Sequence, residues 1–111
     1  WRVTVPTADV VVTNPTHLAI ALKFDSSVDR APRVVAKGKG FNALRIREIA
    51  KESQVPIVEN KPVARLLFQL CEEGQAIDVR LYQAVAEILA FVYRTNQYRY
   101  YQGLRGRTDG A

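Results

Sequence analysis

Residues 8–24 read Ala-Asp-Val-Val-Val-Thr-Asn-Pro-Thr-His-Leu-Ala-Ile-Ala-Leu-Lys-Phe and contain two strand patterns separated by a break. Residues 8–13 form a β-branched run that is typical of a buried strand. Residues 17–24 alternate large and small apolar side chains with a period of two, which indicates a second strand with one large and one small apolar face. Asn14-Pro15 interrupts the pattern because proline cannot donate a ladder hydrogen bond. The chain is therefore expected to turn there.

Beyond this stretch, further short strands alternate with helical spacing. Residues 33–37 predict a third strand, closed by Gly38-Lys39-Gly40, and residues 55–58 predict a fourth, which Pro56 places near a sheet edge. Three helices are predicted: residues 43–52, the segment after Asn60 with Pro62 in its first turn, and a segment capped by Asp78 that runs to about Asn96. The alternation predicts an α/β fold, a single domain whose small mixed four-stranded sheet is packed by about three to four helices. The strand order does not follow from the sequence.

The domain is expected to span residues 8–96. Residues 1–7 are interpreted as a linker or boundary segment. Residues 97–111 are interpreted as a flexible basic tail, because the stretch from Gly103 to Ala111 holds three glycines and has no apolar period.

Composition indicates a globular protein of modest size. The chain has 111 residues, of which 48% are hydrophobic and 24% charged, so a real core is expected. Its one cysteine, Cys71, cannot form an internal disulfide, which fits a reducing compartment. No apolar run approaches the roughly 20 residues of a membrane span, and no signal peptide opens the chain. We therefore expect a soluble, cytosolic piece, whose net charge of +5 favours acidic partners.

Asn14-Pro15-Thr16-His17 is the segment whose chemistry suggests a reaction. Pro15 has no N–H, so it cannot attack the Asn14 side chain, and the usual deamidation route is closed. The Asn14 side-chain nitrogen can instead attack the Asn14 backbone carbonyl, forming a five-membered succinimide and expelling Pro15 as an amine. A fold accelerates such a step by holding the attacking atom about 3–3.5 Å from the carbonyl carbon.

Thr16 and His17 could assist this reaction from within the same loop. The Thr16 hydroxyl could hold the turn in place. His17 is the only histidine, and an imidazole titrates near neutral pH, so it could orient the peptide or carry a proton to Pro15. Asn-Pro is also a common start of a turn, so residue types and spacing alone favour an inert turn with a packed or solvated histidine.

A resemblance to a known family favours the reactive interpretation. The run Val11-Val12-Thr13-Asn14-Pro15-Thr16-His17, followed by an alternating apolar strand, resembles the Asn-Pro-Thr-His signature of the FlhB/YscU/SpaS family of flagellar and type III secretion proteins. The likeness covers about residues 8–94 and is nearer to the flagellar branch. Further segments are similar in the same order: Ala31–Gly38, Ala43–Ala50, Val55–Glu59, Pro62–Arg65 and Leu81–Glu87.

The resemblance implies a cytoplasmic domain that cleaves itself between Asn14 and Pro15 in a single intramolecular turnover. Its cleavage residues map onto Asn14, Pro15, Thr16 and His17. Members of the family also carry an N-terminal membrane domain, so this piece is expected at the cytoplasmic face of the bacterial inner membrane.

The same resemblance implies partners and a role. Fragments 1–14 and 15–111 are expected to stay associated after cleavage, and cleavage is expected to control a switch in export substrate specificity. The expected partners are other export-apparatus proteins, the length-control (ruler) protein, and exported substrates or their chaperones.

Two alternatives stay open on the sequence. One is an uncleaved docking domain of the same family, in which the loop is inert. The other is a basic nucleic-acid-binding module, because tyrosines and arginines alternate near the C-terminus as in stacking surfaces. These residues are Tyr93, Arg94, Tyr98, Arg99, Tyr100, Tyr101, Arg105 and Arg107. No nucleic-acid fold signature accompanies them, so nucleic acid is not the expected partner.

No cofactor and no metal are expected. Gly38-Lys39-Gly40 lacks the spacing of a phosphate-binding loop and is better explained as a turn before a helix. No His, Cys, Asp or Glu cluster has the spacing of metal ligands.

Overall fold

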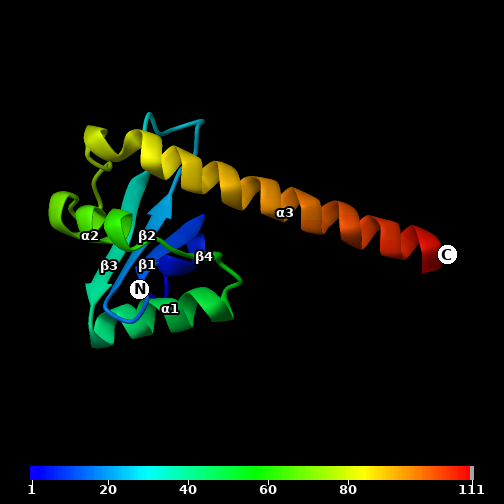
Figure 1. Ribbon diagram of the computed structural model, residues 1–111, viewed down its shortest axis with the longest axis horizontal. Coiled ribbons are helices and arrows are strands. Elements are labelled where there is room, and N and C mark those ends of the chain that lie inside the picture. The colour runs from blue at the N-terminus through cyan, green and yellow to red at the C-terminus, as the bar shows by residue number, and fades with distance from the viewer. Residues whose placement is uncertain (111) are drawn as a thin grey trace.

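The computed structural model describes the backbone of residues 1–110 and the side chains of residues 1–96. The described residues form both strands and helices, and β4 lies between two helices in the chain (Figure 1), which confirms the predicted α/β class. The elements are η1 (Val5–Thr7), β1 (Val10–Asn14), β2 (Leu18–Lys23), β3 (Arg33–Lys39), α1 (Phe41–Glu52), β4 (Ile57–Glu59), α2 (Lys61–Leu70), η2 (Val79–Leu81) and α3 (Tyr82–Gly110), where η marks a short 3-10 helix.

The strands form one four-stranded mixed sheet in the order β3-β2-β1-β4. β1 pairs antiparallel with β2, and Asn14 lies opposite Leu18 at the hairpin end. On its other side β1 pairs parallel with β4, where Thr13 lies opposite Glu59. β1 is therefore an inner strand that is paired along both edges. β4 lies at the sheet edge, as the neighbouring Pro56 predicted.

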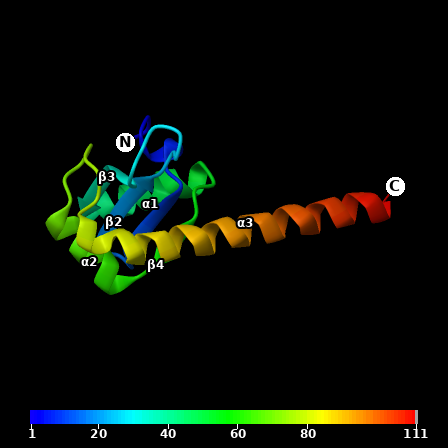
Figure 2. The same ribbon diagram turned by 90° about the horizontal axis from the view of Figure 1, so that it is seen from above.

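Both faces of the sheet are buried, because successive side chains of a strand point to opposite sides. Val10 and Val12 of β1 contribute to a core that includes residues of α2 and α3. Val11 contributes to a second core with residues of α1. Figure 2 shows α1 on the opposite side of the sheet from α2 and the start of α3.

The side chains of β2 differ in size between its two faces, as its alternation predicted. Ile20 and Leu22 belong to the core between the sheet and the helices α2 and α3, whereas Ala19 and Ala21 belong to the core between the sheet and α1. Small residues on that second face allow α1 to lie close to the sheet. Gly38 of β3 marks the closest approach, because a Cβ atom there would lie 2.8 Å from the Cβ of Asn42 in α1.

All four strands have ends that differ from those predicted. β1 covers Val10–Asn14 instead of residues 8–13, and β2 covers Leu18–Lys23 instead of residues 17–24. β3 continues to Lys39, because β2 offers pairing partners along its whole length. β4 covers Ile57–Glu59 instead of residues 55–58. The Pro56 carbonyl accepts a 2.9 Å hydrogen bond from the N–H of Val11, so Pro56 precedes β4 and still contributes to the pairing.

α3 begins and ends later than predicted. Asp78 does act as a cap, since its side chain accepts the N–H of Arg80, but it caps η2, which leads into α3. The helix continues past Asn96 to Gly110 and projects beyond the sheet (Figure 1). A glycine in a helix costs about 1 kcal/mol relative to alanine but does not break the helix sterically as proline does, so the glycines of this segment are compatible with a continued helix.

The division into residues 1–7, 8–96 and 97–111, and the flexibility of the last segment, remain predictions. In the first segment, Val5 is buried in the core below α1. Within the described part of the chain, no helix combines the length and the apolar character that a membrane crossing requires.

Candidate functional site

The four residues singled out in the sequence lie together in the hairpin between β1 and β2. β1 ends at Asn14 and β2 begins at Leu18, so Pro15, Thr16 and His17 form the connection. The His17 N–H donates a 2.7 Å hydrogen bond to the Asn14 carbonyl oxygen. This bond closes a β-turn with proline in its second position, where the fixed φ of proline is favoured.

The carbonyl that accepts this bond is the one that asparagine cyclisation would attack. Attack places negative charge on the Asn14 carbonyl oxygen, and an N–H already aligned with that oxygen stabilises the charge. The bond comes from the main chain of His17 and does not require its imidazole, which is exposed. Asn14 and Pro15 are half-buried, and Thr16 is exposed.

Two more main-chain bonds tie this loop to the starts of two helices. The Asn60 N–H donates to the Thr13 carbonyl oxygen at 2.9 Å, and the Gly40 N–H donates to the His17 carbonyl oxygen at 2.9 Å. Gly40 is the N-cap of α1 and Asn60 is the N-cap of α2. The loop is thus held between the N-terminal ends of the two helices.

Asn60 and Gly40 were missed as loop contacts by the sequence analysis. They lie beside the loop because β4 runs parallel to β1, and because β3 and β2 bring their paired ends together. The available signal was weak: each residue follows a strand and directly precedes a helix. The sequence pattern of a strand followed by a helix shows that such a residue lies at one end of the sheet, but it does not show which other strands end there.

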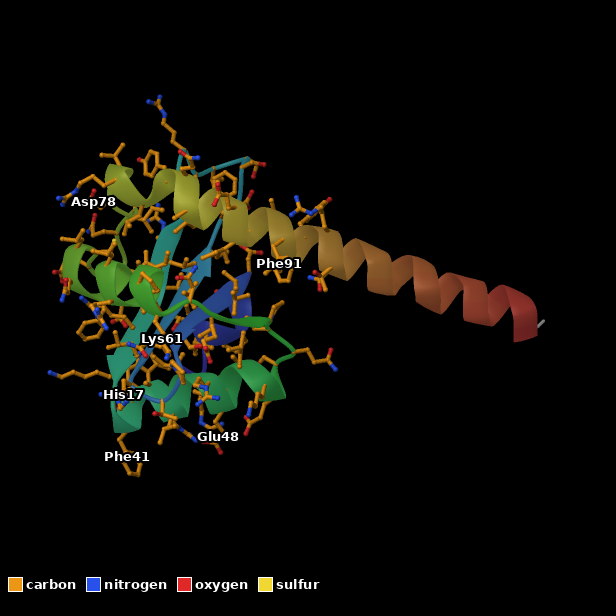
Figure 3. The ribbon with its side chains drawn as sticks, in the orientation of Figure 1. His17, Phe41, Glu48, Lys61, Asp78 and Phe91 are labelled. Carbon is orange, nitrogen blue, oxygen red and sulfur yellow. The ribbon has the colours of Figure 1, made fainter. Side chains whose placement is uncertain are left out.

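This end of the molecule carries charges of both signs, with the positive ones in excess. Lys39 ends β3, Lys61 begins α2 and Glu59 ends β4, and all three are exposed. Neither α1 nor α2 has an acidic residue in its first turn to offset the partial positive charge of the helix N-terminus. Figure 3 shows His17 at the same end as Phe41 and Lys61. Negative charge that develops on the Asn14 carbonyl oxygen is favoured in these surroundings.

A large pKa shift, that of Asp78, lies at the end of the molecule away from the hairpin loop. A side-chain hydrogen bond from Arg80, together with the Arg80 backbone N–H, lowers the pKa of Asp78 to about 2. In Figure 3, Asp78 lies at the opposite end from His17. This shift belongs to the cap of η2 and has no direct contact with the hairpin loop.

The tyrosine and arginine pattern lies mostly outside the described side chains. Tyr93 and Arg94 of α3 are exposed. The side chains of the remaining members, Tyr98, Arg99, Tyr100, Tyr101, Arg105 and Arg107, fall outside the described residues.

Comparison with known proteins places this hairpin in a family. Residues 2–92 match the model of the FlhB HrpN YscU SpaS family. The flagellar biosynthetic protein FlhB of Salmonella typhimurium is 52% identical over 101 residues, which cover 91% of this chain and 26% of that protein. FlhB of Bacillus subtilis is 54% identical over 93 residues, which cover 84% of this chain and 26% of that protein. The chain belongs to the FlhB HrpN YscU SpaS family.

Solved structures agree with this assignment. The crystal structure of the cytoplasmic domain of FlhB from Shewanella putrefaciens superimposes with a TM-score of 0.84 at 41% identity, covering 88% of this chain and 75% of that one. A variant of the EscU C-terminal domain superimposes with a TM-score of 0.79 at 30% identity, covering 82% of this chain and 97% of that one. Against the curated relatives, by contrast, the chain spans only about a quarter of their length.

Proposed function

We propose that this chain is the cytoplasmic domain of a flagellar export-apparatus protein and that it cleaves its own backbone between Asn14 and Pro15. The observation that carries the proposal is the 2.7 Å hydrogen bond from the His17 N–H to the Asn14 carbonyl oxygen, in a hairpin loop that contains an Asn-Pro bond. Kinship with FlhB proteins supports the export role. We infer from the same kinship that the domain lies at the cytoplasmic face of the bacterial inner membrane, next to a membrane domain.

The reaction uses only atoms of the chain. The Asn14 Nδ2 attacks the Asn14 carbonyl carbon, and the new C–N bond closes a succinimide ring. The bond from that carbon to the Pro15 nitrogen then breaks. One proton leaves Nδ2 and one proton arrives on Pro15, which departs as a secondary amine, so no cofactor or second substrate is needed. The His17 N–H lowers the barrier by holding the carbonyl oxygen while it carries negative charge.

Related proteins support the choice of these two residues. Solved structures of the EscU C-terminal domain include variants at an asparagine and variants at the position that directly follows it, a proline. The Asn14-Pro15 pair of this chain has the same order, in a domain of the same fold. We infer that these are corresponding positions.

Cleavage in this loop would break the backbone without separating the two fragments. The break lies between β1 and β2, so fragment 1–14 keeps the strand β1 and fragment 15–111 keeps its pairing partners β2 and β4. We infer that cleavage frees the ends of the loop on an otherwise intact domain, and that this change switches export from one substrate class to another. Other export-apparatus proteins, the ruler protein and exported substrates or their chaperones are the partners that would detect it.

The test is the mass of the purified chain. Wild type is expected to give two masses that sum to the full chain plus the water taken up when the succinimide ring opens, with the break between Asn14 and Pro15. The variant Asn14→Ala lacks the attacking nitrogen and is expected to give one full-length mass and a folded protein. Asn42→Ala is the matched control, because it removes an exposed asparagine of α1 that no proline follows, and it should cleave like wild type.

A single mass for wild type after complete refolding would instead support the uncleaved docking domain. Cleavage that persists in Asn14→Ala would refute asparagine cyclisation.

A further inference from the structure

We propose that Asn60, the N-cap of α2, is a positioning residue for the cleavage reaction. It acts from outside the loop, by holding the peptide group that precedes Asn14. This inference rests on the proposed self-cleavage and names a residue that sets its rate.

The backbone geometry at Asn14 decides whether its side chain can reach its own carbonyl. Each residue has two soft backbone torsions, φ and ψ, which set the orientations of the peptide planes on either side of its Cα. The plane after Asn14 contains the reacting carbonyl, which the His17 N–H holds at 2.7 Å. The plane before Asn14 contains the Thr13 carbonyl, which the Asn60 N–H holds at 2.9 Å. With both planes held, only the side-chain torsions of Asn14 remain free.

Asn60 can hold this plane because α2 holds Asn60. Its side-chain Oδ1 accepts the N–H of Val63 at 3.2 Å, and its main-chain carbonyl accepts the N–H of Ala64 at 2.9 Å. Both acceptors of Asn60 thus bind N–H groups of the first turn of α2, and its own N–H binds β1. Thr13 is only 2% exposed, so water has little access to compete for the bond.

Loss of the cap should therefore act on the reaction and not only on the helix. Asn60→Ala retains the main-chain N–H but removes the acceptor for Val63, so the first turn of α2 frays and the N–H is no longer fixed. A displacement of about 1 Å in a reacting group can cost about 100-fold in rate. We expect Asn60→Ala to slow cleavage by about tenfold, because Thr13 and Asn14 also keep their pairing with β2.

Two other variants separate positioning from stability. Asn60→Ser restores a capping oxygen and should return the rate to within about twofold of wild type. Asp78→Ala removes a cap of the same kind from η2, at the far end of the molecule, and should leave the rate within about twofold of wild type while costing similar stability. The first measurement is the rate constant for cleavage after unfolded precursor is diluted from denaturant. The second is the urea midpoint of unfolding, which reports stability and is measured for each variant combined with Asn14→Ala so that no molecule is cleaved.

The results divide cleanly. Slow cleavage in Asn60→Ala, with near wild-type rates in Asn60→Ser and Asp78→Ala, supports the proposal. Equal slowing in Asn60→Ala and Asp78→Ala would assign the effect to global stability and overturn it, as would an unchanged rate in Asn60→Ala. A wild type that never cleaves would refute the proposed function, a result distinct from all of these.

Discussion

At the scale of single residues, His17 combines two roles that can be separated. Its main chain forms two hydrogen bonds. The His17 N–H donates to the Asn14 carbonyl oxygen, and the His17 carbonyl oxygen accepts the Gly40 N–H. Its imidazole is exposed. The main-chain role survives replacement by any residue other than proline, whereas proton transfer requires the imidazole.

We therefore expect His17→Ala to slow cleavage without abolishing it. Help from a general base is worth about 10²–10⁴-fold, so the loss should reach about 10²-fold if the imidazole carries a proton. Only the neutral imidazole can accept a proton, so the wild-type rate should fall as the pH is lowered. The measurement is a rate profile from about pH 5 to 9 for both proteins.

Thr16→Ala is the control for His17, because it alters the neighbouring loop side chain and removes no titrating group. It should keep the wild-type pH profile. A profile with the same inflection in wild type and in His17→Ala would show that another group titrates, and a loss of only a few-fold would limit His17 to shaping the loop.

At the scale of elements, α2 is held at both ends by residues from the sheet side of the molecule. Asn60 caps its N-terminus. At its C-terminus, the Nζ of Lys37 in β3 donates to the carbonyl oxygens of Phe68 at 3.0 Å and Cys71 at 2.9 Å. The same Nζ lies 4.8 Å from the centre of the Phe68 ring. A cation at this position also opposes the partial negative charge of the helix end.

Lys37→Met is expected to destabilise the domain by about 1–2 kcal/mol, because two carbonyl oxygens lose a charged donor and the aromatic ring loses its cation. The measurement is the free energy of unfolding in urea, in the Asn14→Ala background so that every molecule is intact. Lys39→Met is the control, since Lys39 lies in the same strand and is exposed. If both substitutions cost the same, the cap on α2 contributes nothing specific.

At the scale of the whole molecule, the inner position of β1 determines whether fragments 1–14 and 15–111 would stay together after the proposed cleavage. Fragment 1–14 supplies a strand that is paired on one side with β2 and on the other with β4. Its valines Val5, Val10, Val11 and Val12 are fully buried. Burial of this much apolar surface is worth several kcal/mol, at about 25 cal/mol per Å2. Separation would open the middle of the sheet and both cores at once.

The two fragments are therefore expected to co-elute in native buffer and to separate in denaturant. Val11→Asp should weaken the complex strongly, because it places a carboxylate in the core below α1. Val3→Asp is the matched control on the same fragment, since Val3 is 82% exposed and should tolerate the charge. Size-exclusion chromatography of the cleaved proteins at micromolar concentration gives the comparison. Spontaneous separation of the wild-type fragments would contradict an inner β1.

Much of this domain could be predicted from local patterns. The β-branched run of residues 8–13 indicated a buried strand, and the structure confirms it. The alternation of residues 17–24 indicated a strand with one large and one small apolar face, which the structure also confirms. Asn14-Pro15 indicated a turn, because a proline nitrogen cannot join a ladder. Patterns of this kind are readable because the information lies in neighbouring residues, whose side chains alternate by covalent geometry alone.

The neighbours of the Asn14–His17 loop could not be predicted in the same way. That β4 runs beside β1, so that the Asn60 N–H meets the Thr13 carbonyl, depends on the strand order, and each strand could have satisfied its own pattern in another order. The same holds for Gly40 at the His17 carbonyl. The sequence by itself determined the strands, the turn and the residues that are proposed to react. Only the tertiary structure decided which distant N–H groups hold that turn, because main-chain hydrogen bonds are available to every residue and leave no mark on side-chain identity.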